Sequence, residues 1–161
     1  MHARTATPDD AGAICRIYNE GIADRLATFE TRLRSVDDIR TWFTPTHPIV
    51  VVEDGDGMVV AFASTSTYRP RDCYRGVAEF SVYVARNVRG KGAGRVAMVA
   101  LIDAARAAGF WKLLSRVIVE NTASRRLLAS AGFREVGTYE KHAQLDGVWR
   151  DVVIVERLLD Q

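Results

Sequence analysis

The stretch Arg89-Gly90-Lys91-Gly92-Ala93-Gly94-Arg95 lies between an apolar run typical of a strand and an alanine-rich run typical of a helix. Glycines at such a junction let backbone N–H groups turn toward one anion, and the N-terminus of the next helix adds about half a positive charge. The basic side chains of the loop can add charge-assisted hydrogen bonds. The sequence therefore predicts a phosphate-binding loop, with a solvated glycine-rich turn as the alternative.

Two known phosphate-binding patterns can be compared with this loop. The pattern GxxxxGK followed by Ser or Thr does not fit, because Gly92 follows Lys91. The dinucleotide pattern GxGxxG/A does fit at residues 92–97, and Glu120 ends the next expected strand where the ribose-binding acid belongs. A dinucleotide site needs two βαβ halves, however, and the chain offers one before it turns to a hairpin. The architecture thus favours a different phosphate ligand.

The elements expected around the loop form one mixed sheet. Upstream, a helix opens at Thr7-Pro8-Asp9-Asp10 and ends at Gly21, and a short helix opens at Ser35. Strands are expected at 49–53, 58–67, 78–85, 113–120, 134–145 and 148–158, with helices at 92–108 and 122–131. The order ααββ-βαβα-ββ predicts an α/β fold (an α+β mixed sheet) in a single domain over residues 1–161.

Composition excludes several classes of protein. The chain has 161 residues, 48% of them hydrophobic and 26% charged, with a net charge of +2, which is typical of one globular domain. No uncharged run approaches the roughly 20 residues of a membrane span, and the first residues form no apolar signal segment, so a cytoplasmic location is expected. Basic residues are spread along the chain, which argues against nucleic acid as a partner. The cysteines and histidines have no metal-ligand spacing, so no metal is expected.

Several motifs carry a family resemblance. Arg89-x-x-Gly92-x-Gly94 resembles the diphosphate loop of the GCN5-related N-acetyltransferases, and Asn121-x-x-Ser124-x-x-Leu127 followed by Gly132-Phe133 resembles their later helix. Tyr18-Asn19 with Thr28-Phe29-Glu30, and the segments 79–84 and 145–152, are similar to the phosphinothricin N-acetyltransferase group, which includes enzymes acting on methionine sulfoximine and arsinothricin. The resemblance covers nearly the whole chain. It implies a single acetyltransferase domain, acetyl-CoA as cosubstrate and a homodimer.

The strand at 78–85 is expected to carry the chemistry. Its alternation puts Phe80, Val82 and Val84 on one face and Glu79, Ser81 and Tyr83 on the other. The resemblance places the general base at Glu79, which would act directly or through water. The alternative is an ordinary surface carboxylate, as expected for an isolated glutamate on a strand. Tyr83 is the second predicted catalytic residue, with an ordinary half-buried tyrosine as the alternative.

The resemblance also implies a set of cofactor-binding residues. Backbone groups of Val82 and Val84 would pair with the pantetheine arm, and one amide would meet the thioester oxygen. Asn121 would contact the cofactor and can also cap the following helix, and Ser130 would approach the sulfur. The full predicted set is Val82, Val84, Arg89, Gly90, Lys91, Gly92, Ala93, Gly94, Arg95, Asn121 and Ser130.

A small anionic amino acid is the predicted acceptor, because the arginines before the catalytic strand can clamp carboxylate, phosphinate or arsinate oxygens. The predicted substrate-binding residues are Phe29, Glu30, Arg71, Asp72, Cys73, Tyr74 and Arg75. A protein N-terminus, a lysine or a polyamine is an alternative acceptor. A nucleotide-binding module without catalysis is the alternative of a different class.

Two positions depart from the family pattern. Leu128 stands where many members have a tyrosine that protonates the leaving thiolate, so the thiolate would leave unassisted or take its proton from Tyr83, Tyr139 or water. Asp146 stands where some phosphinothricin enzymes have a histidine or an aromatic residue. An acid there would repel a phosphinate or make a different contact.

Overall fold

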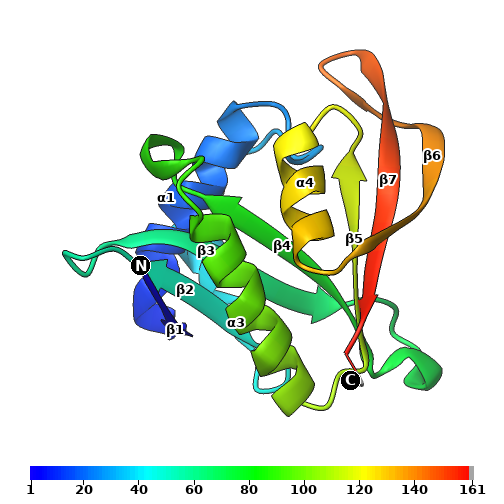
Figure 1. The fold of residues 1–161 in the computed structure, drawn as a ribbon. Coiled ribbons are helices and arrows are strands. Elements are labelled where there is room, and N and C mark those ends of the chain that lie inside the picture. Colours follow the sequence, from blue (N-terminus) through cyan, green and yellow to red (C-terminus); the bar gives the residue numbers. More distant parts are fainter. Residues whose placement is uncertain (160–161) are drawn as a thin grey trace.

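The computed structural model describes residues 1–159, which form a seven-stranded sheet with helices on both faces (Figure 1). The strand order is β1-β2-β3-β4-β5-β7-β6. The strands are β1 (His2–Thr5), β2 (Ile49–Glu53), β3 (Val59–Thr67), β4 (Val77–Val84), β5 (Lys112–Ile118), β6 (Arg134–Leu145) and β7 (Val148–Leu158). The α-helices are α1 (Ala11–Ala23), α2 (Val36–Arg40), α3 (Ala93–Ala107) and α4 (Thr122–Ser130), with 3-10 turns at Pro8–Asp10, Asp72–Tyr74 and Arg86–Val88.

The predicted fold class is confirmed, and the predicted order needs one addition. β1 precedes the helices and pairs antiparallel with β2, which makes the order βααβββαβαββ. The four residues of β1 have little apolar character and therefore give no strand signal in the sequence. The strand is held in place by Arg4, which bonds to Glu53 on β2 and to Asp10 at the end of the first 3-10 turn. Within the described residues only β4 and β5 pair in parallel, so the doubly wound sheet of a dinucleotide site is absent.

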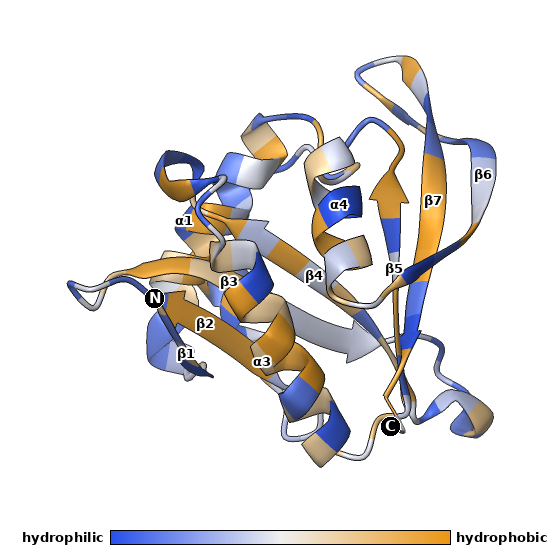
Figure 2. Cartoon of the chain, viewed as in Figure 1, coloured by the Kyte–Doolittle hydropathy of each residue, from blue (hydrophilic) through white to orange (hydrophobic). Residues whose placement is uncertain are grey.

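The sheet separates two hydrophobic cores. β2 is buried along most of its length and is coloured mainly as hydrophobic in the view by hydropathy (Figure 2). On one face α3, through Leu101, and α4 pack over Phe80 and Leu113 of the sheet, and on the other face α1 and α2 pack over Phe62. Both faces of the central strands are therefore covered, as the mixed α/β prediction requires. None of the helices within residues 1–159 has both the length and the apolar character to cross a membrane.

The α1 helix runs past Gly21 and ends at Ala23, so the expected helix end at Gly21 is wrong. Gly21 is buried, and a Cβ added to it would lie 2.6 Å from the ring of Tyr83 on β4. That ring also stacks on Phe62 with centroids 5.5 Å apart. The glycine is present because the ring of Tyr83 needs the space, so α1 and the middle of the sheet approach closely here.

Replacing Gly21 with alanine tests this close approach. We expect Gly21→Ala to lower the free energy of unfolding by about 1–3 kcal/mol, because the new methyl group overpacks a buried aromatic contact. Gly12→Ala on the same helix is the matched control, since a Cβ at Gly12 meets nothing within 4 Å. Chemical denaturation of the two variants gives the measurement. Equal stabilities would contradict the packing argument.

Candidate active site

The sheet opens between β4 and β5, and this opening creates the site. The two strands pair only from Val77–Lys112 to Glu79–Leu114, whereas β3 stays paired with β4 as far as Val84. Beyond the last parallel pair, the Ser115 hydroxyl donates to the Phe80 carbonyl oxygen at 2.8 Å. β5 continues against β7 on its other side. The last half of β4 therefore has one edge without a strand neighbour in the described chain.

The free edge presents backbone groups of the two predicted valines. The Ala85 N–H donates to the Val60 carbonyl at 2.8 Å, so odd-numbered residues of β4 bond toward β3. Backbone groups alternate in direction along a strand. The N–H and C=O groups of Val82 and Val84 therefore point into the opening, and the Val84 carbonyl accepts from Arg89 Nε at 3.3 Å. An extended ligand could bond to this edge as an added strand.

A cavity of about 360 Å³ continues from the opening along the glycine loop. Predicted cofactor residues that line it are Val82, Val84, Arg89, Gly90, Gly92, Ala93, Gly94, Arg95 and Asn121, and Tyr83 lines it as well. Lys91 is exposed on the loop, and neither it nor Ser130 is part of this lining. Most of the residues that the sequence singled out for a phosphate ligand thus share one cavity.

The glycine loop leads directly into α3. Gly92 is the N-cap of α3 with φ of +90°, a left-handed conformation that favours glycine. Because glycine supplies no capping side chain, the first N–H groups of α3 remain available to an anion. Gly94 is buried, and a Cβ there would lie 2.9 Å from Leu127 on α4. The loop therefore combines an anion-binding helix end with a close helix contact.

Asp24, which the sequence analysis missed, faces the same cavity from the end of α1. One of its carboxylate oxygens accepts from Arg86 at 2.8 Å and the other from Arg89 at 2.5 Å. These two guanidinium groups hold the pKa of Asp24 below its ordinary value. The Glu20 carboxylate accepts a hydrogen bond from the backbone N–H of Arg86, which is a second contact between α1 and this segment. The end of α1 thus fixes the start of the glycine loop.

Glu79 lies at the base of the opening, on the face of β4 that α1 and α2 cover. Its carboxylate accepts from one nitrogen of Arg116 at 3.2 and 3.1 Å, and its side chain is 24% exposed. Arg116 comes from β5 and lines a small pocket inside the opening. The parallel register, which sequence reasoning does not supply, brings this arginine to Glu79. The pair gives the predicted base a cationic neighbour that orients it.

Tyr83 is enclosed by other aromatic rings. Its ring lies 5.0 Å from that of Tyr18 in an edge-to-face contact and stacks on Phe62. Burial raises the pKa of Tyr83 well above its ordinary value, and a hydrogen bond with Thr28 opposes that shift. The phenol therefore keeps its proton through the physiological pH range and can act as a donor next to the cofactor cavity.

The remaining predicted residues on and near α4 have structural contacts. Asn121 caps α4, since its side chain accepts from the Ser124 N–H at 3.3 Å, and it lines the cavity too. Ser130 accepts from Arg95 at 2.9 Å, which ties the loop to the end of α4. Leu128 is buried at the wall of the opening, whereas Tyr139 is 51% exposed on β6. Of the candidate proton donors, Tyr83 is therefore the side chain at the cavity.

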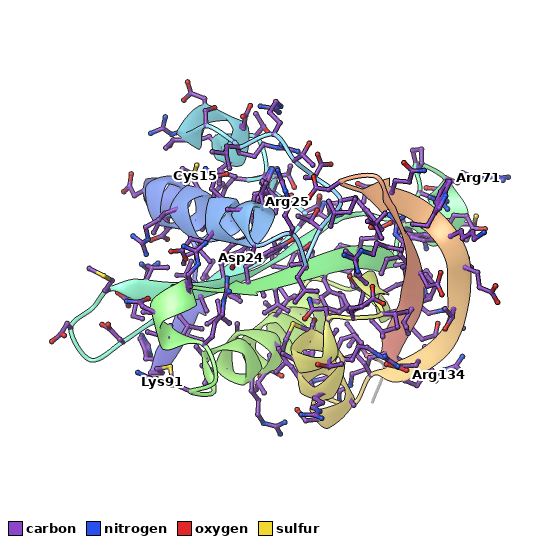
Figure 3. All side chains as sticks on the ribbon, turned by 90° about the horizontal axis from the view of Figure 1, so that it is seen from above. Cys15, Asp24, Arg25, Arg71, Lys91 and Arg134 are labelled. Carbon is purple, nitrogen blue, oxygen red and sulfur yellow. The ribbon has the colours of Figure 1, made fainter. Side chains whose placement is uncertain are left out.

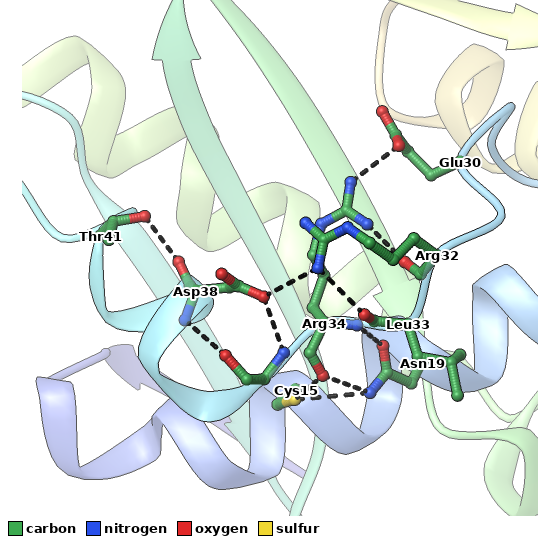
Figure 4. A network of polar contacts seen from close by, with 9 residues as sticks. Cys15, Asn19, Glu30, Arg32, Leu33, Arg34, Asp38 and Thr41 are labelled. Atoms are coloured by element: carbon green, nitrogen blue, oxygen red, sulfur yellow. Dashed lines mark hydrogen bonds and ion pairs between the residues drawn. The ribbon is translucent and has the colours of Figure 1, made fainter.

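The loop that carries Phe29 and Glu30 is pinned to α1 (Figure 4). Asn19 accepts from the Arg34 N–H at 2.9 Å and donates to the Arg34 carbonyl at 3.0 Å, while the Arg34 guanidinium pairs with Glu30 at 2.7 Å. Glu30 is thus already neutralised by a neighbour. Phe29 and Glu30 line neither the cavity along the glycine loop nor the small pocket inside the opening.

The basic loop before β4 lies far from the glycine loop. Arg71 and Lys91 stand at opposite ends of the molecule in the view from above (Figure 3). Arg71, Asp72, Cys73, Tyr74 and Arg75 are all exposed and line neither of these two cavities. The loop immediately precedes β4, the strand of Glu79, at the end of that strand opposite the glycine loop.

Asp146 makes a contact that the sequence could not specify. At the tip of the β6–β7 hairpin it pairs with Arg25, which follows α1, at 3.2 Å. Both side chains are largely exposed, so the pair contributes little stability. Its effect is local: the charge that would repel an anionic substrate is compensated, and the hairpin tip is linked to the loop after α1.

Comparison with known proteins agrees with the geometry of the site. The model of the "Acetyltransferase (GNAT) family" matches residues 16–133. The chain belongs to the GNAT acetyltransferase family. It is 32% identical to the L-methionine sulfoximine/L-methionine sulfone acetyltransferase of Salmonella typhimurium, over 100% of this chain and 96% of that protein. It is 30% identical to the phosphinothricin N-acetyltransferase of Streptomyces coelicolor, over 99% and 96%.

A solved structure agrees with this membership. The structure of yncA from Salmonella typhimurium with its cofactor acetyl-CoA has a TM-score of 0.94 and 32% identity, and the match covers 100% of this chain and 95% of that one. The predicted family, fold and enzyme class are therefore confirmed. Three charged residues of this acetyltransferase, Asp24, Arg25 and Arg116, were missed because nothing local in the sequence marks their partners.

The cap of α3 gives a direct test of the glycine loop. We expect Gly92→Ala to weaken binding of coenzyme A about tenfold or more, because losing one charge-assisted backbone contact costs about 1.5–3 kcal/mol. Calorimetric titration with coenzyme A is the measurement. Gly109→Ala is the control: Gly109 also has a left-handed φ, of +93°, but follows α3 at its far end. If both variants bind coenzyme A as the wild type does, the loop is not an anion site.

Proposed function

We propose that this GNAT protein transfers the acetyl group of acetyl-CoA to the α-amino group of a small anionic amino acid, of the kind represented by phosphinothricin, methionine sulfoximine and arsinothricin. The observation that carries the proposal is the opening between β4 and β5. It has a cavity of about 360 Å³ on the side of the glycine loop and a carboxylate, Glu79, at its base. The names of the relatives support the same choice of substrate group.

Binding of acetyl-CoA would use the chain as follows. The N–H groups at the start of α3, with Arg89 and Arg95, hold the diphosphate. The free edge of β4 holds the pantetheine arm through Val82 and Val84, and one of these amides donates to the thioester oxygen as negative charge develops there. Asn121 borders the arm from the far side of the opening. These assignments fit the cavity lining, although Ser130 would act through Arg95.

The transfer forms one C–N bond and breaks the C–S bond. The ammonium group of the acceptor loses two protons, one before the attack and one as the amide forms, while the departing thiolate gains one. Glu79 takes the first proton, directly or through one water, with Arg116 fixing the carboxylate, and later releases it to solvent. Tyr83 is protonated because burial raises its pKa; it gives its proton to the thiolate, which Leu128 cannot do, and the second proton from nitrogen restores the phenol.

The acceptor would approach from the face covered by α1 and α2. Arg71 and Arg75, in the loop before β4, are the proposed contacts for acidic groups of the substrate, with Asp72, Cys73 and Tyr74 shaping that loop. The loop with Phe29 and Glu30 is proposed to border the acceptor on the opposite side, although these two side chains line none of the cavities. We further propose a homodimer, as the family resemblance implies.

Replacing Glu79 with glutamine tests the base. We expect Glu79→Gln to lower kcat by about 100-fold or more, as for loss of a general base, with little change in affinity for coenzyme A. The assay follows thiol release with phosphinothricin, methionine sulfoximine and arsinothricin. Glu140→Gln, an exposed change on β6, serves as the control.

Other outcomes of the same assay reject parts of the proposal. Normal turnover by Glu79→Gln removes Glu79 as the base. Turnover with peptide N-termini, lysine or polyamines in place of small amino acids replaces the acceptor class. Tight binding of coenzyme A without transfer to any amine favours the alternative function, a nucleotide-binding module without catalysis.

Two tyrosine variants test the proton donor. We expect Tyr83→Phe to lower kcat by about 100-fold, because the thiolate then leaves without its acid. Tyr139→Phe should leave kcat unchanged, since that phenol is exposed on β6. Steady-state kinetics with a saturating acceptor separate the two. Equal activity of Tyr83→Phe and wild type would leave water as the donor.

A further inference from the structure

A second cavity, of about 340 Å³, lies on the face of the sheet opposite α3 and is used by none of the roles proposed above. α1 and the segment after α2 supply its walls, and β3 and β4 supply its floor. It is lined by Tyr18, Thr41, Trp42, Thr44, His47, Ser64, Thr65, Ser66, Thr67 and Ser81. Its volume is near the lower limit for ligand pockets, so it suits a small molecule.

The floor of this cavity adjoins Glu79. In the β3–β4 register Ser66 stands opposite Glu79, and Ser64 stands opposite Ser81. Side chains that face each other across such a pair have Cβ atoms about 5 Å apart. The carboxylate of Glu79 is therefore beside one lining serine and two positions along the strand from another. A molecule whose amine reaches Glu79 can place its remaining atoms in the cavity.

The cavity also borders the pocket on the cofactor side. Ser81 lines both this cavity and the small pocket inside the β4–β5 opening. That pocket shares Val82, Tyr83 and Asn121 with the cofactor cavity. Three neighbouring pockets thus extend from the glycine loop, through the opening, to the hydroxyl-lined cavity. Their order matches that of cofactor, reacting atoms and acceptor.

The lining has a distinct chemistry. Eight of the ten residues carry hydroxyl groups, and the other two are Trp42 and His47. Burial lowers the pKa of His47, so its imidazole is neutral at physiological pH. Among the described residues this lining has no lysine, arginine or carboxylate. Hydroxyls donate and accept, so they complement neutral oxygen- and nitrogen-bearing groups.

We infer that this cavity is the acceptor side-chain subsite and that it selects an amino acid with a short, uncharged, strongly hydrogen-bonding tail, such as a sulfone or a sulfoximine. The inference rests on the proposed function and narrows it. A phosphinate or arsinate tail is negatively charged. Binding of that charge in this cavity is unfavourable, because the charge would leave the exposed arginines and the cavity lining contains no cation to compensate it. The arginines outside the cavity are then left for the α-carboxylate.

Three acceptors that differ in the tail decide this point: methionine sulfone, phosphinothricin and methionine. We expect kcat/KM for the sulfone to exceed that for phosphinothricin by about tenfold or more. Methionine has no tail oxygens, so the cavity hydroxyls lose their partners and methionine should also be about tenfold poorer than the sulfone. Comparable or better use of phosphinothricin would overturn the inference.

Variants of the lining locate the selectivity. Ser64→Ala and, on a separate wall, Thr44→Val should each raise KM for methionine sulfone by about two- to tenfold, as for loss of one neutral hydrogen bond, with kcat nearly unchanged. KM for phosphinothricin should change less than twofold. Thr138→Ala removes an exposed hydroxyl on β6 and should change neither. Equal effects of Ser64→Ala and Thr44→Val on both acceptors would overturn the inference.

Failure of the proposed function would be seen separately. If no acceptor is acetylated, the proposed activity falls. Calorimetry of methionine sulfone and phosphinothricin with the coenzyme A complex then still decides the inference, because it measures binding alone. Preferential binding of the sulfone that weakens in Ser64→Ala supports the subsite, and its absence rejects it.

Discussion

The separation of β4 from β5 is the constraint on which the site depends. A strand edge inside a sheet normally has a partner, because buried N–H and C=O groups without one are costly. Here the parallel pairing stops at Glu79 and Leu114, and one side-chain hydroxyl, that of Ser115, satisfies the next carbonyl. The edge beyond it, with Val82 and Val84, is left for a ligand. The pairing with β3, which continues as far as Val84, holds the strand on its other side.

The charges around the opening are arranged in local pairs. Arg89 pairs with Asp24, Glu79 with Arg116 and Asp146 with Arg25, whereas Arg95 is held by a hydrogen bond to the neutral Ser130. Each exposed pair contributes little to stability. Together they position four groups that face the site and prevent like charges from accumulating there. The net charge of +2 conceals this arrangement, since it sums charges that the fold has already matched.

Much of the fold followed from local patterns. The glycine loop, the cap at Asn121 and the hairpins at residues 54–57 and 146–147 depend on residues adjacent in the chain, so their positions could be predicted within a few residues. The position of β1 could not be predicted, because its four residues have little apolar character and form a strand only where β2 offers an edge and Arg4 bonds to Glu53 and Asp10. Gly21 was misassigned for a similar reason: its role comes from Tyr83, 62 positions away in sequence order.

The sequence by itself determined the anion loop, the two faces of β4 and hence the pairing of Glu79 and Tyr83 on one face, because these depend on the periodicity of a single segment. The tertiary structure alone decided that Arg116 meets Glu79, that Arg25 neutralises Asp146, and that hydroxyls from β3, β4 and the segment after α2 enclose a cavity without charged groups. Each of these depends on strand register and on packing between segments distant in the chain, and a local pattern carries neither.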